Sequence, residues 1–182
     1  MAHQVHQLFE AESTVYDTLR DIQGKLVPRH VARVHLALSP PNDDAAELLD
    51  IKGTLLQYIE GISLSKLQDH APKSEWQGIV DQAVAIVQEI GDHGVLNRDV
   101  RPDCFIVQND GDGCYKVFMI DFGLARLRGR DKSDRDWAKA KLTKDEEGAV
   151  GLVMRLRLAR EGFELRFENL DRYMEWAGGD DE

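Results

Sequence analysis

The chain has 182 residues, 42% of them hydrophobic, which suits one compact domain. Its 33 acidic and 23 basic residues give a formal net charge of -10, which would repel a nucleic-acid backbone. No apolar run reaches membrane-spanning length, and the first residues do not form a signal peptide. The two cysteines have no CxxC spacing and indicate a reducing compartment. We therefore expect a soluble, cytoplasmic protein whose partners are neither nucleic acids nor membranes.

The N-terminal third predicts a helix followed by a β-hairpin. Apolar residues recur at helical spacing in residues 10–22, and the helix should end near Gly24. Residues 30–38 are rich in β-branched side chains and predict a strand, and residues 40–47 predict a polar loop. Residues 47–61 then predict a second strand that runs into a turn, so the two strands should form a hairpin.

Residues 74–94 predict the central helix of the core. Ser74 followed by Gln77 matches a capping box, and the glycines near the end of the segment are typical of a helix C-terminus. Apolar side chains cover so much of this helix that it should be largely buried. These side chains are Ile79, Val80, Ala83, Val84, Ile86, Val87 and Ile90.

A second hairpin is predicted downstream. Residues 104–108 and 115–121 form the two strands, and the turn between them has the sequence NDGDG, whose residues tolerate positive φ. Asp99 precedes the first strand and Asp121 ends the second, so the hairpin can bring the two carboxylates to one end of the sheet, close enough to share a cation or a substrate.

The remaining chain predicts one more helix. Residues 126–145 are polar and rich in charge, which predicts an irregular, solvated segment, whereas residues 146–162 return to helical periodicity. The tail GGDDE at 178–182 predicts disorder.

The motif NRDVRPDC at 97–104, the second hairpin and the motif DFG at 121–123 follow the buried helix in the order found in the protein kinase superfamily, which the chain resembles from about Glu12 to Leu158. The resemblance implies a truncated kinase-like fold of class α+β, with a small β-hairpin remnant of the N-lobe and a mainly helical partial C-lobe. The implied boundaries are 1–61 for the N-lobe remnant, 62–175 for the partial C-lobe and 176–182 for the disordered tail.

The resemblance also implies roles for charged residues. Asp99 matches the aspartate that orients or deprotonates the hydroxyl nucleophile, and Asp121 matches the magnesium-binding aspartate. Arg98 matches the arginine that steadies the activation segment, and Arg101, in the same motif, joins Asp99 and Arg98 as a catalytic candidate. Glu147 stands where the family usually carries an aspartate in the helix after this segment.

The cofactors implied by the resemblance are ATP and Mg²⁺. The segment LLQYIEGISL resembles the hinge, where backbone groups of Gln57, Tyr58 and Ile59 would meet an adenine ring. Glu12 is the candidate for the glutamate that forms an ion pair with the family's lysine.

Departures from the family pattern favour a catalytically impaired protein. The residues before Glu12 contain neither a lysine nor a glycine, so the Gly-rich loop and the strand lysine are missing. Cys104 replaces the asparagine that binds a second magnesium ion, and a thiol is a poor ligand for this hard cation. Asn97 replaces the usual histidine and can still serve as a hydrogen-bonding scaffold.

Three interpretations of the function remain open. The first is a pseudokinase that acts through protein contacts, and the second is a minimal Mg-ATP-dependent phosphotransferase, acting on a protein or a small molecule, that uses Asp99 and Asp121. The third is a fragment of a longer protein with no independent role.

For individual residues, structural roles compete with functional ones. Asp121 could cap the turn, Asp99 could bond the backbone of its loop, Glu12 could be an exposed helix carboxylate, and Cys104 could be a small buried side chain. In a complete kinase further strands cover the first hairpin, so here we expect an open apolar face. A second copy of the chain or another protein would cover it.

Overall fold

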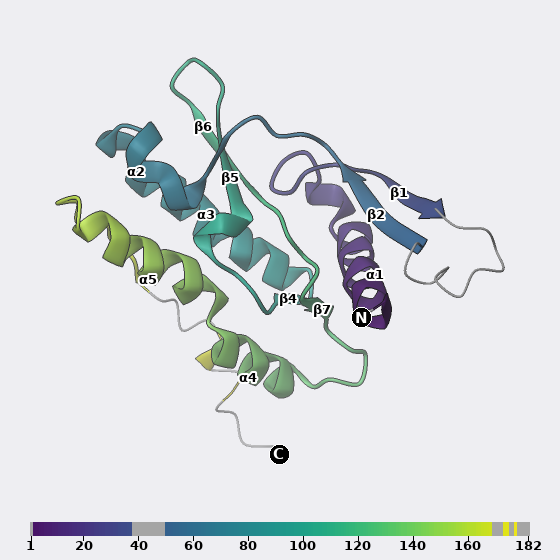
Figure 1. Ribbon diagram of the computed structural model, residues 1–182. Helices are drawn as coiled ribbons and strands as arrows, with labels where there is room; N and C mark the ends of the chain where they lie inside the picture. Colours follow the sequence, from purple (N-terminus) through teal and green to yellow (C-terminus); the bar gives the residue numbers. More distant parts are fainter. Residues whose placement is uncertain (1, 38–49, 169–172, 175–176, 178–182) are drawn as a thin grey trace.

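The computed structural model describes residues 2–37, 50–168, 173–174 and 177 (Figure 1). Helices are combined with small antiparallel sheets, which confirms the α+β class. The helices are α1 (Ala2–Thr18), α2 (Leu67–His70), α3 (Trp76–Asp92), α4 (Asp134–Lys144) and α5 (Glu146–Ala159). The strands are β1 (His30–Ala37), β2 (Asp50–Leu56), β3 (Ile62–Ser63), β4 (Val95–Asn97), β5 (Phe105–Asn109), β6 (Tyr115–Met119) and β7 (Ala125–Leu127). The predicted loop at 40–47 lies outside the described residues, as does the tail at 178–182.

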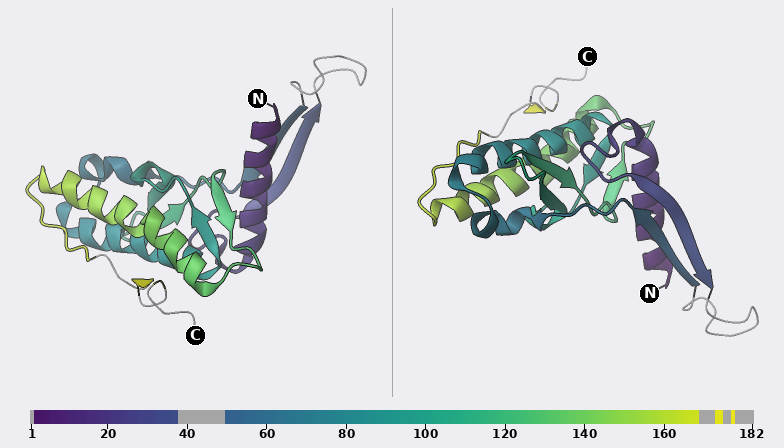
Figure 2. Two further views of the ribbon diagram at one scale, coloured as in Figure 1. Left: turned by 90° about the horizontal axis from the view of Figure 1, so that it is seen from below. Right: turned by 90° about the horizontal axis from the view of Figure 1, so that it is seen from above.

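The predicted N-terminal helix and hairpin are both present. α1 begins at Ala2, earlier than the periodicity indicated, and Gly24 with φ of 72° lies in the turn after it. β1 and β2 pair antiparallel, with Arg33 opposite Thr54 and Leu36 opposite Ile51. Figure 2 shows α1 and this hairpin side by side, standing to one side of the body that contains α2 to α5.

The hairpin turns its polar face towards α1 and its apolar face away from it. Arg33 forms an ion pair with Asp17 of α1, and Lys52 Nζ lies 3.2 Å from His6 Nδ1. Side chains alternate along a strand, so the neighbouring positions point to the opposite face. The apolar side chains of that face are between 38% and 53% exposed: Val34, Leu36, Ile51 and Leu55. The expected open apolar face is therefore confirmed, and we call these four residues the outer hairpin face.

α3 forms the centre of the core, as predicted. It contacts α5 and β6, and all the apolar residues expected to be buried are at most 2% exposed except Val84, which is half-buried. Gln82 ties the helix to the second hairpin, because its side chain donates to Tyr115 O at 3.1 Å and accepts from Val117 N at 3.3 Å. The β5–β6 hairpin is confirmed as well.

The predicted capping box at the start of α3 is wrong. A 3-10 turn at Lys73–Glu75 precedes the helix, so Glu75 occupies the N-cap position and Ser74 Oγ donates to the Glu75 carboxylate at 3.1 Å. Gln77 instead exchanges two hydrogen bonds with the backbone of Arg166. Because a chain segment distant in sequence takes up this side chain, the local pattern did not predict its partner.

The predicted irregular segment at 126–145 is wrong in part, because it contains β7 and α4. Ser133 caps α4 by accepting from Asp136 N at 3.1 Å. Trp137, Ala138 and Lys141 form a buried face of the helix, and two of these side chains carry polar groups. Apolar periodicity cannot detect a helix whose buried face is so narrow.

Two glycines of α3 give a matched test of this packing. A Cβ added at Gly91 would lie 2.8 Å from Lys141 Nζ and 2.9 Å from Tyr173 Oη, whereas one added at Gly78 would meet no atom within 4 Å. We expect Gly78→Ala to raise the free energy of unfolding by about 0.5–1 kcal/mol through helix propensity. Gly91→Ala should lower it by about 1–3 kcal/mol through overpacking. Urea denaturation measures both values, and equal stabilisation by the two variants would contradict the close packing at Gly91.

Candidate functional site

Asn97 organises the loop that carries Asp99. It ends β4, and its side-chain Oδ1 accepts from Asp99 N at 3.1 Å while its Nδ2 donates to Asp121 O at 3.0 Å. Asp121 has φ of 68°, a left-handed conformation that few residues other than glycine adopt. One amide group therefore fixes the backbone at both aspartates, in keeping with the scaffold role expected of Asn97.

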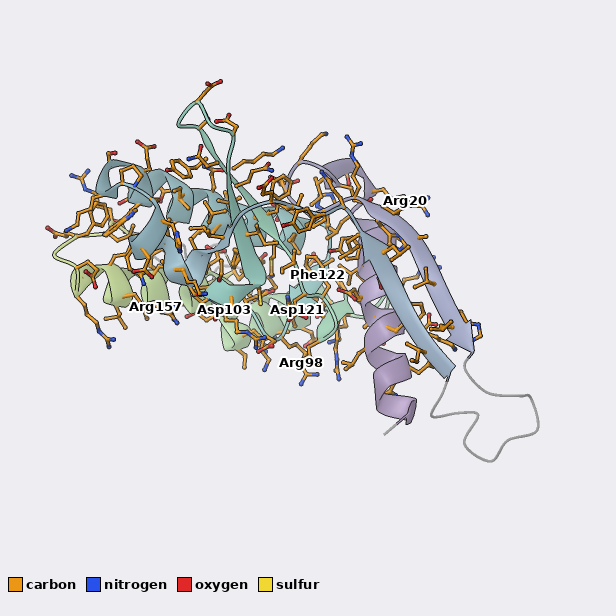
Figure 3. The ribbon with its side chains drawn as sticks, turned by 45° about the horizontal axis from the view of Figure 1, so that its top comes forward. Arg20, Arg98, Asp103, Asp121, Phe122 and Arg157 are labelled. Atoms are coloured by element: carbon orange, nitrogen blue, oxygen red, sulfur yellow. The ribbon has the colours of Figure 1, made fainter. Side chains whose placement is uncertain are left out.

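Arg101 lies between the two aspartates. Its Nη1 is 2.5 Å from Asp99 Oδ2, and its Nη2 is 3.6 Å from Asp121 Oδ2. The three side chains are between 38% and 50% exposed, so each ion pair alone contributes little to stability. The carboxylates meet at one end of the β5–β6 hairpin, as the sequence indicated, and a guanidinium bridges them. Figure 3 labels Asp121 and, next to it, Phe122. We call Asp99, Arg101 and Asp121 the carboxylate site.

Cys104 lies beneath this site as a buried thiol. It is 1% exposed, and its Sγ donates to Asp99 O at 3.3 Å. Burial raises the pKa of the thiol to about 11, so the side chain is neutral at physiological pH. A neutral thiol is a poor metal ligand, because metals bind the thiolate. The role of a small buried side chain, one of the two considered from the sequence, is confirmed.

Glu12 is not the exposed helix carboxylate that the sequence favoured. It is half-buried, and Thr54 Oγ1 lies 3.5 Å from Glu12 Oε2. Burial raises the pKa of Glu12, the nearby Phe122 N–H lowers it, and the negative charge of Asp121 raises it further. Among the described residues no lysine or arginine forms an ion pair with Glu12.

Aromatic packing joins α1 to the turn that contains Asp121. The centroids of the Tyr16 and Phe122 rings lie 5.4 Å apart in an edge-to-face arrangement, and Tyr16 stacks on His30 with centroids 5.8 Å apart. Tyr16 and Phe122 are both fully buried. These contacts hold Glu12 close to the carboxylate site, and no sequence pattern indicated this role for Tyr16.

The remaining candidates lie outside the carboxylate site. Arg98 is exposed and forms no ion pair with any described residue. In the proposed hinge, Gln57 N donates to Arg29 O at 2.8 Å and the Gln57 side chain accepts from Arg29 N, so Arg29 occupies both groups. Tyr58 is 85% exposed, whereas Ile59 is buried.

A buried carboxylate missed by the sequence analysis supports the loop. Glu146 Oε1 accepts from Asn97 N at 2.7 Å, whereas Glu147, the residue singled out from the sequence, accepts from Gln88 Nε2 at 2.9 Å. Glu146, and not Glu147, therefore contacts the loop that carries Asp99. In a run of two glutamates only the rotation of the helix decides which one faces β4.

No protein-family model matches the chain. None of the helices in the described part of the chain is both long and apolar enough to cross a membrane. Across the same residues, no cluster of three or more histidine, cysteine and acidic side chains could hold a metal ion. The carboxylate site offers two carboxylates already bridged by Arg101, and the Cys104 thiol beneath it is neutral, so these groups fit a magnesium ion poorly.

The half-buried Glu12 predicts an unusual dependence of stability on pH. Burial favours the protonated carboxyl of Glu12 in the folded chain and so raises its pKa. Above the raised pKa, the ionised carboxylate lowers the stability of the folded chain. This loss of stability disappears as the pH falls through the raised pKa. We expect Glu12→Gln, which keeps an oxygen acceptor, to be more stable than the wild type at pH 7 and to lose this advantage towards pH 4. Chemical denaturation across this range measures the difference. A destabilised Glu12→Gln at pH 7 would indicate a cation partner for Glu12.

Proposed function

We propose that the chain is a catalytically impaired, kinase-like protein that acts by binding another protein chain. The order of its elements supports the resemblance: α1, the β1–β2 hairpin, α3, the loop with Asp99, the β5–β6 hairpin and the turn with Asp121 follow one another as that fold requires. Fold alone does not determine activity. The argument for impaired catalysis therefore depends on the carboxylate site.

The observation that carries the proposal is the position of Arg101 between Asp99 and Asp121. A guanidinium cannot lose its charge at physiological pH, so it offsets one of the two negative charges without a metal ion. Phosphoryl transfer depends on preorganised charges around the phosphates, and loss of one such contact costs about 3 kcal/mol of transition-state stabilisation. Cys104 supplies a neutral thiol in place of the oxygen ligand of the family pattern, so one such contact is lost at this site.

The alternative is a magnesium- and ATP-dependent phosphotransferase. Its support is the convergence of Asp99 and Asp121 at a partly exposed site, where a metal ion and a phosphate could displace Arg101 from one carboxylate or the other. Arg101 would then bind phosphate instead of competing with the metal ion. The two functions thus assign opposite roles to one side chain, which makes Arg101 the residue to test.

The proposed partner is a second copy of the chain, seated on the outer hairpin face. This face carries no charged side chain, so two copies can stack it without bringing like charges together, although each copy has a formal net charge of -10. The hairpin stands to one side of the body, which leaves room for a twofold arrangement (Figure 2). Four apolar side chains form a small patch, so we expect a weak and reversible dimer.

Calorimetry with Mg-ATP tests the impaired site. We expect no binding to the wild type at about 1 mM nucleotide, the range in which interactions contribute only about 4 kcal/mol. Arg101→Gln should increase the affinity of the carboxylate site for Mg²⁺ in the absence of nucleotide, because the competing positive charge is removed. Asp121→Ala removes one carboxylate of the site, and Asp112→Ala, which removes an exposed carboxylate in the β5–β6 turn, is its matched control.

The opposite outcome supports the phosphotransferase. Magnesium-dependent ATP binding to the wild type that is abolished by Asp121→Ala, weakened by Arg101→Gln and unchanged by Asp112→Ala would show that the site handles nucleotide. Phosphate acceptors would then be sought among proteins and small molecules.

Light scattering across a concentration series tests the second copy. We expect a concentration-dependent dimer that Leu36→Gln and Leu55→Gln each weaken at least about tenfold, since burying a leucine contributes roughly 1.5–3 kcal/mol. Leu156→Gln is the control, because Leu156 of α5 is 58% exposed but lies outside the outer hairpin face. A wild type that stays monomeric would exclude the second copy and leave the face open to a different protein.

A further inference from the structure

Lys141 of α4 is a buried ammonium group that the proposed function does not use. Its residue is 6% exposed, its Nζ forms an ion pair with Glu146 and lies 3.4 Å from Val95 O. The rings of Trp137 and Tyr173 lie 6.0 Å and 5.8 Å from Nζ. Lysine is almost never fully buried unless it is paired, so the contacts around this one indicate a defined role.

Hydrogen bonds lead from Lys141 to the carboxylate site. Glu146 uses Oε2 for Lys141 and Oε1 for Asn97 N, the latter at 2.7 Å. Asn97 in turn accepts from Asp99 N at 3.1 Å and donates to Asp121 O at 3.0 Å. Each link is a direct contact between described residues, and the path crosses from α4 through the start of α5 and the end of β4.

We propose that Lys141 is a positioning residue, which holds Glu146 in place and thereby fixes Asn97 and the relative placement of Asp99 and Asp121. Without Lys141, the Glu146 carboxylate would be a buried charge with no cation partner among the described residues, and it would take up a proton or turn towards water. Either change weakens the acceptor for Asn97 N. The proposal concerns the placement of the aspartates and does not depend on nucleotide binding.

The geometry also connects the site to the surface of α4. At the other end of this helix, Asp134 pairs with Arg128, and Arg128 N donates to Gly94 O at 2.8 Å, next to β4. α4 is thus attached to the β4–β7 ladder at its start through Arg128 and at its end through Lys141. A contact that displaces the end of α4 would withdraw Lys141 from Glu146 and release the loop with Asp99.

Amide hydrogen exchange measured by NMR tests this inference on the full chain. In Lys141→Met we expect exchange at Asn97 N–H and Asp99 N–H to accelerate at least about tenfold relative to the wild type, because both amides lose well-placed acceptors. The double variant Lys141→Met with Glu146→Gln keeps an oxygen for Asn97 N and has no unpaired buried charge. It should return both amides to within about threefold of the wild type.

Gln88→Met is the matched control, because it removes the Gln88–Glu147 hydrogen bond between α3 and the same end of α5 but leaves Glu146 and Asn97 untouched. Unchanged exchange at Asp99 in Lys141→Met, or equal acceleration in Gln88→Met, would overturn the proposal. If Lys141→Met does not fold, Lys141→Gln takes its place, since it keeps a donor without the charge. Exchange at both amides should then accelerate at least about threefold, and no acceleration would overturn the proposal equally.

Discussion

The two hydrogen bonds of the Asn97 side chain are the constraint on which the carboxylate site depends. A single amide group supplies an acceptor to Asp99 N and a donor to Asp121 O, so it joins two loops that are separated by the whole β5–β6 hairpin. Few other side chains offer both functions in this geometry without a change of protonation state. Asp121 has a left-handed backbone conformation, which is strained for a residue other than glycine. The hydrogen bond from Asn97 to the Asp121 carbonyl group holds the backbone in this conformation.

The charge in this site comes from the chain itself. Arg101 gives the paired carboxylates an internal counter-ion, and the neighbouring Cys104 thiol is neutral. The shared guanidinium keeps the two aspartates close together, because each carboxylate contacts one of its nitrogens. The same contacts make the convergence of two aspartates a weak argument for catalysis, since a structural explanation is present in full.

The sequence predicted the elements that depend on local patterns. The burial of α3 follows from Ile79, Val80, Ile86 and their neighbours, and the β5–β6 hairpin follows from turn glycines with positive φ. The failures concern polar side chains that contact distant parts of the chain: Gln77 contacts Arg166, Glu146 contacts Asn97 and Lys141 contacts Val95. A periodicity argument assumes that polar groups face water. Their burial depends on where other elements bring a partner, which no single segment encodes.

In the β1–β2 hairpin, too, polar side chains contact another element of the chain. Its polar residues pack against α1, where Arg33 finds Asp17, and its aliphatic residues face solvent. A two-stranded hairpin is marginal by itself, so these contacts with α1 hold it in place and fix the direction in which the apolar face points. The contacts with α1, and not burial of the aliphatic side chains, therefore set where the open apolar face points, and the proposed recognition role depends on that face.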